Sequence, residues 1–164
     1  MRTTDPDPFA AYYAARYRAL RRTAYLLCGD WHEAEDLTQA AFVRLYLAWG
    51  RIRADGAHAY ARRVLLNEFL GRRRRYREHP VEALPDRPGP AGGSPDDRLD
   101  LSAALRAVPP QQRAVVVLRY WEGLSVQQTA ALLGIAQGTV KSQAARGLAA
   151  LRVRAAHRQI EETP

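Results

Sequence analysis

Side chains able to read DNA bases gather in one short segment near the C-terminus. They combine amides, hydroxyls and cations, namely Gln137, Thr139, Lys141, Ser142, Gln143 and Arg146. Such groups exchange hydrogen bonds with base edges in the major groove, and the cations also contact phosphates. The segment therefore predicts a surface that recognises duplex DNA by binding.

A helix-turn-helix over residues 125–151 is the element expected to present these side chains. Its signals are a capping box, a small residue where two helices cross, a turn glycine and an apolar pair between the helices: Ser125 with Gln128, Ala130, Gly134, and Ile135 with Val140. A plain helical hairpin with a solvated polar face is the alternative. Such a hairpin does not need all four signals, so we favour the DNA-binding motif.

Charged clusters in the N-terminal half could also form sites. The pair His32-Glu33 does not begin a zinc-protease motif, because Asp36 stands where the second histidine is required. Carboxylates on one helix turn do not face each other across a cleft, which disfavours a hydrolase. A basic run at residues 72–75 is either a solvated helix end or a stripe for phosphates, and we favour the phosphate stripe.

Composition narrows the class of partner. The formal net charge is +8, which favours a polyanionic partner, either nucleic acid or an anionic membrane surface. Cys28 is the one cysteine, so an internal disulfide and a multi-cysteine zinc site are excluded. We expect no metal and no cofactor. The sequence has no signal-peptide core and no apolar run long enough to span a membrane, so we expect a soluble cytoplasmic protein.

A segment rich in proline and glycine divides the chain. Residues 80–97 contain five of the ten prolines and read as a flexible linker between two small helical domains, residues 1–79 and 98–158. Apolar residues recur every three or four positions on both sides of this segment, and no strand pattern is visible. We expect three or four helices before the linker, with breaks at Gly29 and near residues 50–56. The predicted fold class is all-α.

Four stretches together resemble the extracytoplasmic-function sigma factors of bacterial RNA polymerase, of the SigE-like actinobacterial type. They are GDWHEAEDLTQAAFVRLY (29–46), AYARRVLLNEFLGRRRR (59–75), VPPQQRAVVVLRYWEGLS (108–125) and GTVKSQAARGLAALR (138–152). The resemblance covers nearly the whole chain outside the linker and the tails. It implies a non-enzymatic factor that binds core RNA polymerase and promoter DNA, with no small-molecule substrate.

The resemblance assigns roles to residues of the N-terminal domain. Its second helix would dock on the polymerase through Asp36, Leu37, Gln39 and Phe42, with Leu37 and Phe42 as exposed apolar anchors, although core packing is an equal alternative for Phe42. Its third helix would open the minus-ten element, with Asn67 reading a flipped base. The phosphates of the opened strand would contact Arg62, Arg63, Arg72, Arg73, Arg74 and Arg75. Tyr60 would either stack on a base or pack in the core.

The resemblance also assigns the C-terminal domain to the minus-thirty-five element. Gln143 departs from the arginine that the family usually carries, and glutamine pairs best with adenine. The linker would tether two separately docked domains. An anti-sigma factor is a further partner that the family commonly has. The alternative function is a stand-alone helix-turn-helix transcriptional regulator, which would leave the N-terminal half without a role.

Overall fold

The computed structural model of this chain describes residues 7–79 and 95–161. The helices are α1 (Pro8–Cys28), α2 (Trp31–Ala48), the short turns η1 (Trp49–Arg51) and η2 (Ala54–Gly56), α3 (Ala57–Glu78), α4 (Pro95–Arg106), α5 (Pro110–Val116), the π-helical η3 (Val117–Trp121), α6 (Val126–Leu133) and α7 (Gln137–Glu161). The described residues contain no strand, which confirms the all-α prediction. Each of these helices is too short or too polar to cross a membrane.

Local signals set the helix ends in the N-terminal half. Gly29 ends α1 in the left-handed conformation, with a φ of 75° that glycine adopts without strain. Asp30 then caps α2, because its Oδ1 atom accepts hydrogen bonds from the backbone N–H groups of His32 and Glu33 at 2.7 and 3.0 Å. The Glu33 side chain does not complete a capping box and instead forms an ion pair with Arg73. The predicted break at Gly29 is therefore confirmed. The predicted break near residues 50–56 is confirmed as well, because the short turns η1 and η2 separate α2 from α3 there.

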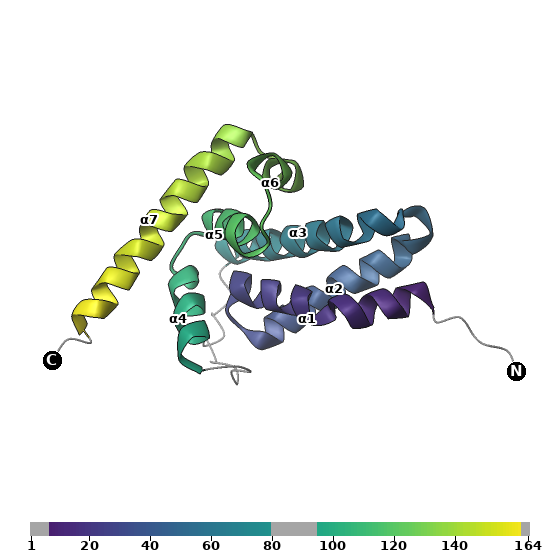
Figure 1. The fold of residues 1–164 in the computed structure, drawn as a ribbon, viewed down its shortest axis with the longest axis horizontal. Helices are drawn as coiled ribbons and strands as arrows, with labels where there is room; N and C mark the ends of the chain where they lie inside the picture. The colour runs from purple at the N-terminus through teal and green to yellow at the C-terminus, as the bar shows by residue number, and fades with distance from the viewer. Residues whose placement is uncertain (1–6, 80–94, 162–164) are drawn as a thin grey trace, which may run out of the picture.

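Helices α1, α2 and α3 pack side by side around an apolar core (Figure 1). Leu27, Leu45, Leu65 and Phe69 are fully buried in it. An aromatic cluster closes one end, where Phe42 meets the rings of Phe9 and Tyr13 nearly edge-on. This bundle fixes which faces of α2 and α3 remain outside.

In the C-terminal half, α6 and α7 form a second small cluster around Val115, Ala130, Val140 and Ala144. Helix α7 extends well past this cluster at one end of the molecule (Figure 1). Gly147 lies where α7 meets α5, and a Cβ atom there would come within 2.6 Å of Val116 Cγ2. Close packing on α5 therefore holds α7 in place.

The two halves pack on each other, which the expectation of two separate domains did not include. Leu105, Ala114 and Leu118 belong to the same buried cluster as Leu20 and Phe69. Residues 80–94 of the predicted linker lie outside the described residues. The remainder, residues 95–97, is the first turn of α4, so the helix begins earlier than the sequence indicated.

Candidate polymerase and nucleic-acid interfaces

The helix-turn-helix forms as predicted. Ser125 Oγ accepts a hydrogen bond from the backbone N–H of Gln128 at 3.0 Å, and Gln128 Oε1 accepts one from the N–H of Ser125 at 2.9 Å. Gly134 adopts a φ of 66° between α6 and α7. Val140 is fully buried and Ile135 packs against its cluster. These contacts set the angle between the helices, and they leave the N-terminal turns of α7 with one face outside.

The predicted base-reading side chains divide into two groups on α7. Gln137, Lys141, Ser142 and Arg146 are exposed on the outer face. Thr139 is half-buried. Gln143 is also half-buried, and its Oε1 atom is buried without a hydrogen-bond partner in the described part of the chain. The role of Gln143 in reading a base stays a prediction, and in this structure its amide oxygen is buried against the packed side of α7.

A small cationic groove adjoins the same helix. It has a volume of about 350 Å³, and Arg119, Lys141 and Arg152 line it together with Leu148. Arg119 and Arg152 were not among the predicted site residues. Arg119 comes from η3 and Arg152 from α7, so their approach depends on packing between distant segments and has no signal in the local sequence.

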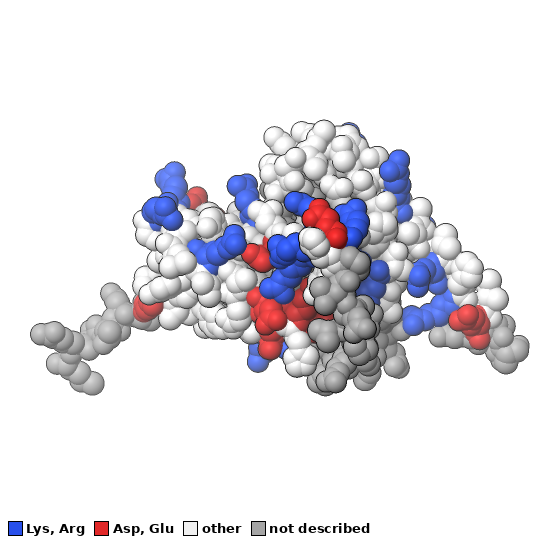
Figure 2. All heavy atoms as spheres, turned by 180° about the vertical axis from the view of Figure 1, so that it is seen from behind, with Lys and Arg blue, Asp and Glu red and all other residues white. Residues whose placement is uncertain are grey.

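On α3, the exposed face carries Arg63, Asn67, Arg74 and Arg75. Arg63 and Asn67 are four residues apart and Arg74 is seven residues further, so one stripe of the helix presents an amide between cations. Figure 2 shows Lys and Arg side chains on the left and right sides of one face of the molecule, and acidic side chains near the middle of that face. Tyr60 packs against the core cluster, which favours the core alternative for that ring.

Three of the predicted phosphate-binding arginines are half-buried and already hold carboxylates. Arg72 Nε lies 3.9 Å from Glu68, and Arg73 Nη2 lies 3.2 Å from Glu33 Oε2. Arg62 pairs with Glu122 of the C-terminal half. These side chains are anchored in the fold, so the exposed arginines of the stripe are the ones free to meet DNA directly.

Leu37 is not an exposed docking residue, contrary to the expectation, and for Phe42 the alternative of core packing holds. Their side chains are 0% and 2% exposed, because both face α1 in the core. The exposed apolar residues of α2 are Val43, Tyr46 and Leu47, at 56%, 61% and 72%. Asp36 and Gln39 are exposed on the same helix, as expected.

The surface formed by Asp36, Gln39, Val43, Tyr46 and Leu47 is called the α2 outer face below. Its members recur at helical spacing on the side of α2 opposite the buried stripe. That second period was the signal in the sequence that could have identified them.

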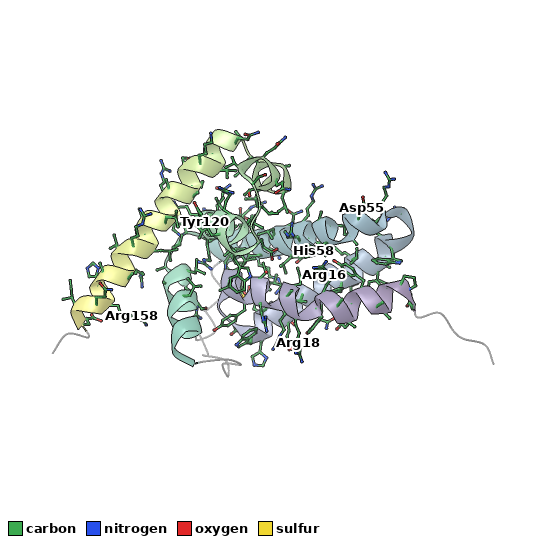
Figure 3. All side chains as sticks on the ribbon, in the orientation of Figure 1. Arg16, Arg18, Asp55, His58, Tyr120 and Arg158 are labelled. Carbon is green, nitrogen blue, oxygen red and sulfur yellow. The ribbon has the colours of Figure 1, made fainter. Side chains whose placement is uncertain are left out.

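A polar group lies between α1 and α3. Tyr12 Oη is 3.4 Å from His58 Nδ1, and Arg16 and His58 lie between the two helices (Figure 3). Burial lowers the pKa of His58, and the cations Arg62 and Arg16 lower it further, while Glu122 opposes them. The lowered pKa favours the neutral imidazole. This ring therefore adds no positive charge to the cationic surface at neutral pH.

Comparison with known families identifies this arrangement. The family model "Sigma-70 region 2" matches residues 12–79, and the model "Sigma-70, region 4" matches residues 98–151. The chain belongs to the sigma-70 family. Region 2 corresponds to the α1–α3 bundle of this sigma factor, and region 4 covers most of its C-terminal half from α4 onward.

Characterised sigma factors are similar over most of the chain. The RNA polymerase sigma-E factor of Streptomyces coelicolor is 43% identical over 148 residues, covering 88% of this chain and 84% of that protein. The ECF RNA polymerase sigma factor SigE of Mycolicibacterium smegmatis is 41% identical and covers 80% of this chain and 55% of its own length. The resemblance to SigE-like sigma factors is confirmed.

A solved structure has the same fold. The sigma factor RpoE from Bartonella quintana, in complex with the anti-sigma factor NepR, superposes with a TM-score of 0.71 at 27% identity. The match covers 89% of this sigma factor and 95% of that chain. It spans both helical halves.

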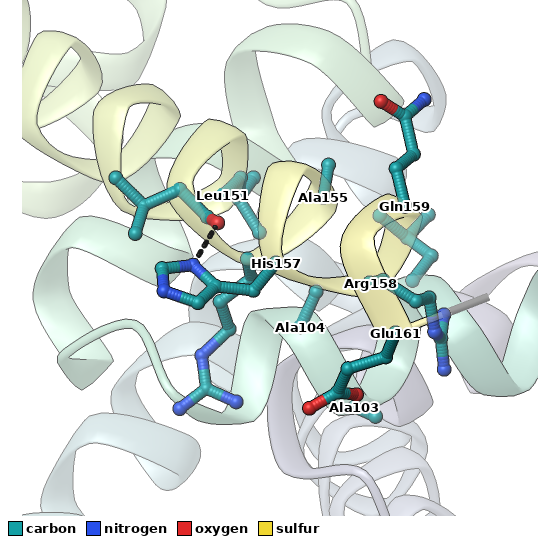
Figure 4. Close-up of a pocket in the computed structure, with 11 residues that line it drawn as sticks. Ala103, Ala104, Leu151, Ala155, His157, Arg158, Gln159 and Glu161 are labelled. Carbon is teal, nitrogen blue, oxygen red and sulfur yellow. Dashed lines mark hydrogen bonds between the residues drawn. The ribbon is translucent and has the colours of Figure 1, made fainter. Parts of the chain in front are cut away.

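A cavity among the described residues lies between α4 and α7 (Figure 4). Its volume is about 870 Å³ and its lining is mainly aliphatic, including Leu101, Ala104 and Leu151. His157 is at the rim, where its Nδ1 atom is 2.8 Å from the backbone carbonyl of Val153. The cavity lies far along α7 from the residues predicted to read bases, and we assign it no part in DNA recognition.

Proposed function

We propose that this sigma factor directs core RNA polymerase to promoters by reading two DNA elements with its two helical halves. Residues 1–79 bind the polymerase and act on the minus-ten element, and residues 98–158 read the minus-thirty-five element. Residues 80–97 connect them. The observation that carries the proposal is that one chain contains both sigma regions, each with an exposed polar face on the helix expected to meet DNA.

The α2 outer face is the proposed polymerase-docking surface. Val43, Tyr46 and Leu47 supply exposed apolar area, which gives affinity when a partner covers it. Asp36 and Gln39 supply polar contacts at its edge, which orient the partner. Leu37 and Phe42 support this surface from beneath by fixing the helix in the core.

The exposed stripe of α3 is the proposed site for the opened minus-ten strand. The Asn67 amide both donates and accepts hydrogen bonds, so it can read the edge of an unstacked base. Arg63, Arg74 and Arg75 lie along the same helix and would hold phosphates on either side. Capture of unstacked bases supplies part of the free energy of melting, together with the contacts that the polymerase makes.

The N-terminal turns of α7 are the proposed reader of the minus-thirty-five duplex. Lys141, Ser142 and Arg146 are exposed there, and Gln137 precedes them at the first turn. Gln143 would need to rotate out of the packed side of α7 to contact a base. Arg119 and Arg152 of the neighbouring groove are placed to add contacts to phosphates.

Binding, rather than a chemical reaction, accounts for these surfaces. We infer that the factor is not an enzyme and that it works in the cytoplasm, where promoter DNA is transcribed. An anti-sigma factor is a proposed partner, because the similar RpoE structure contains one. Such a partner would act by covering surfaces that the polymerase needs.

Run-off transcription tests this function. Core polymerase with the full chain should produce transcripts from a promoter template carrying both elements, and core polymerase alone should not. The alternative, a stand-alone helix-turn-helix regulator, predicts tight DNA binding without polymerase and no new transcript. That result would overturn the proposal.

A further inference from the structure

The cationic groove beside the helix-turn-helix contains three cations and no carboxylate. It lies between η3 on one side and α7 on the other, with Arg119 from η3 and with Lys141 and Arg152 from α7. In the part of the chain that the structure describes, none of its lining residues is acidic and none of these three cations forms an ion pair. The groove therefore differs from the half-buried arginines of α3, which already hold carboxylates.

Small side chains of α7 keep the groove open. Ala144 and Ala145 line it, and a larger side chain at the exposed Ala145 would occupy the space. Leu148 lies seven residues after Lys141, and Arg152 follows four residues later, so one face of α7 presents an aliphatic floor between two cations. At 1.5 Å per residue, these cations are about 16 Å apart along the helix axis. A ligand that reaches both must carry negative charge at more than one place.

Tyr120 adds an aromatic surface to the groove. Its ring is 56% exposed, and in Figure 3 it lies on the side of η3 that is turned toward α7. The Arg119 guanidinium lies 5.6 Å from the centre of this ring and donates a hydrogen bond to the backbone carbonyl of Leu124. These contacts position both side chains before any ligand binds. In addition, η3 is π-helical, and π-helical turns occur frequently at functional sites.

The groove combines the groups that recognise a nucleotide. Guanidinium and ammonium groups bind phosphate oxygens, and an exposed tyrosine ring stacks on a planar base. The groove volume of about 350 Å³ lies in the range of small-molecule sites, which begins near about 300 Å³. An isolated phosphate would leave the aliphatic floor and the ring unused. A duplex keeps its bases stacked inside the helix and would offer Tyr120 only its backbone.

We propose that this groove binds a nucleotide with two or more phosphates, and that the bound nucleotide competes with the minus-thirty-five duplex for the same cations. The second part rests on the proposed function, since it takes these cations as DNA contacts. The phosphates meet Arg119, Lys141 and Arg152, and the base stacks on Tyr120. Promoter recognition by the C-terminal half then depends on the concentration of such a nucleotide.

Isothermal titration calorimetry of the full chain with three probes tests the site. ATP supplies a base and phosphates, adenosine supplies the base and sugar alone, and inorganic tripolyphosphate supplies phosphates alone. ATP should bind about tenfold more tightly than tripolyphosphate, because only ATP stacks on Tyr120. Adenosine should bind most weakly, and Tyr120→Ala should remove the advantage of ATP. Equal affinity of the unchanged chain for ATP and tripolyphosphate would overturn the nucleotide site.

Two matched pairs of variants separate the groove from the general attraction of a chain with a net charge of +8. Arg152→Gln should weaken ATP binding about tenfold, whereas Arg154→Gln removes the same charge from an exposed position outside the groove and should leave it unchanged. Ala145→Leu fills the groove without a change of charge and should also weaken ATP binding. Ala149→Leu adds the same side chain at an exposed position outside the groove and should not. Equal effects within either pair would overturn the site.

Displacement of DNA then tests the competition separately. The anisotropy of a fluorescein-labelled duplex of random sequence reports its binding to the full chain at constant ionic strength. ATP at ten times its Kd should lower the apparent duplex affinity about tenfold in the unchanged chain, because the two ligands exclude each other, and should have little effect in Ala145→Leu. If ATP binds in the groove but does not displace the duplex, the DNA role of these cations is wrong and only the nucleotide site stands. If Arg152→Gln weakens duplex binding and ATP does not bind, the groove contacts DNA alone and the nucleotide site is wrong.

Discussion

Asn67 is the exposed amide on the α3 stripe, with Arg63 one turn before it. Because its side chain makes no core contact, its substitution should not disturb the bundle. Its proposed work begins only when the DNA strands separate, since a paired base presents its edge to the other strand. A substitution at Asn67 can therefore test promoter opening separately from polymerase binding.

We expect Asn67→Ala to impair promoter opening and to leave core polymerase binding intact. Permanganate footprinting of the minus-ten region measures opening, and the affinity of the fluorescent factor for core polymerase measures binding. Glu78→Gln, an exposed change on the same helix, serves as the control. An equal loss of opening and polymerase binding would contradict a base-reading role for Asn67.

Leu47 and Leu37 form a matched pair on α2, at 72% and 0% exposure. Leu47→Ala should weaken core polymerase binding by more than about 1 kcal/mol, because an exposed anchor is lost, and should change stability by less than about 0.5 kcal/mol. Leu37→Ala should lower the free energy of unfolding by about 2–5 kcal/mol, because it leaves a cavity in the core.

Chemical denaturation and polymerase titration of both leucine variants check this pair. If Leu47→Ala binds polymerase as tightly as the unchanged chain does, the α2 outer face is not the docking surface.

At the scale of elements, Gly134 controls the turn between α6 and α7. Its φ of 66° is unfavourable for a side chain, and no atom lies within 4 Å of the place that a Cβ atom would occupy. Gly134→Ala should therefore cost about 1–2 kcal/mol through backbone strain alone. Gly138 has the same open surroundings in a helical conformation, so Gly138→Ala should stabilise the chain by less than about 1 kcal/mol.

Thermal unfolding of the two glycine variants measures the difference. Equal effects at both positions would show that the turn does not depend on the left-handed conformation of Gly134.

Elements of this sigma factor were predictable where their signals are local. The caps at Asp30 and Ser125 and the turn glycines Gly29 and Gly134 act on neighbouring residues, so the sequence placed the helix ends well. The burial of Leu37 was not predicted and that of Phe42 was left open, since α2 carries apolar residues on two faces and only packing decides which face meets α1. The Arg62–Glu122 ion pair joins residues sixty positions apart, and the sequence around either residue does not predict its partner.

At the scale of the whole molecule, the shared core predicts that the two halves unfold together. Trp31 and Trp49 report on the N-terminal half and Trp121 on the C-terminal half. We expect single-tryptophan variants and circular dichroism to give one coincident urea transition, because Leu118 and Arg113 pack against α1 and α3. Two separate transitions would contradict the packing of the halves on each other.

Two DNA-binding halves joined in one chain would also account for promoter specificity. Each half alone offers a small surface, and linking them makes the second contact intramolecular, which raises the effective concentration. Net charge of +8 adds attraction to DNA without sequence preference. We therefore propose that specificity comes from the residues of α3 and α7 that are proposed to read bases, acting together while the factor is bound to the polymerase.

Transcription from a randomised promoter library by core polymerase and the full chain tests this claim most directly. Sequencing of the transcripts' templates should show two separated blocks of preferred bases upstream of the start site. Asn67→Ala should alter the downstream block, and Arg146→Ala the upstream one. A single preferred block that the chain binds tightly without polymerase, together with no start-site selection, would contradict the account.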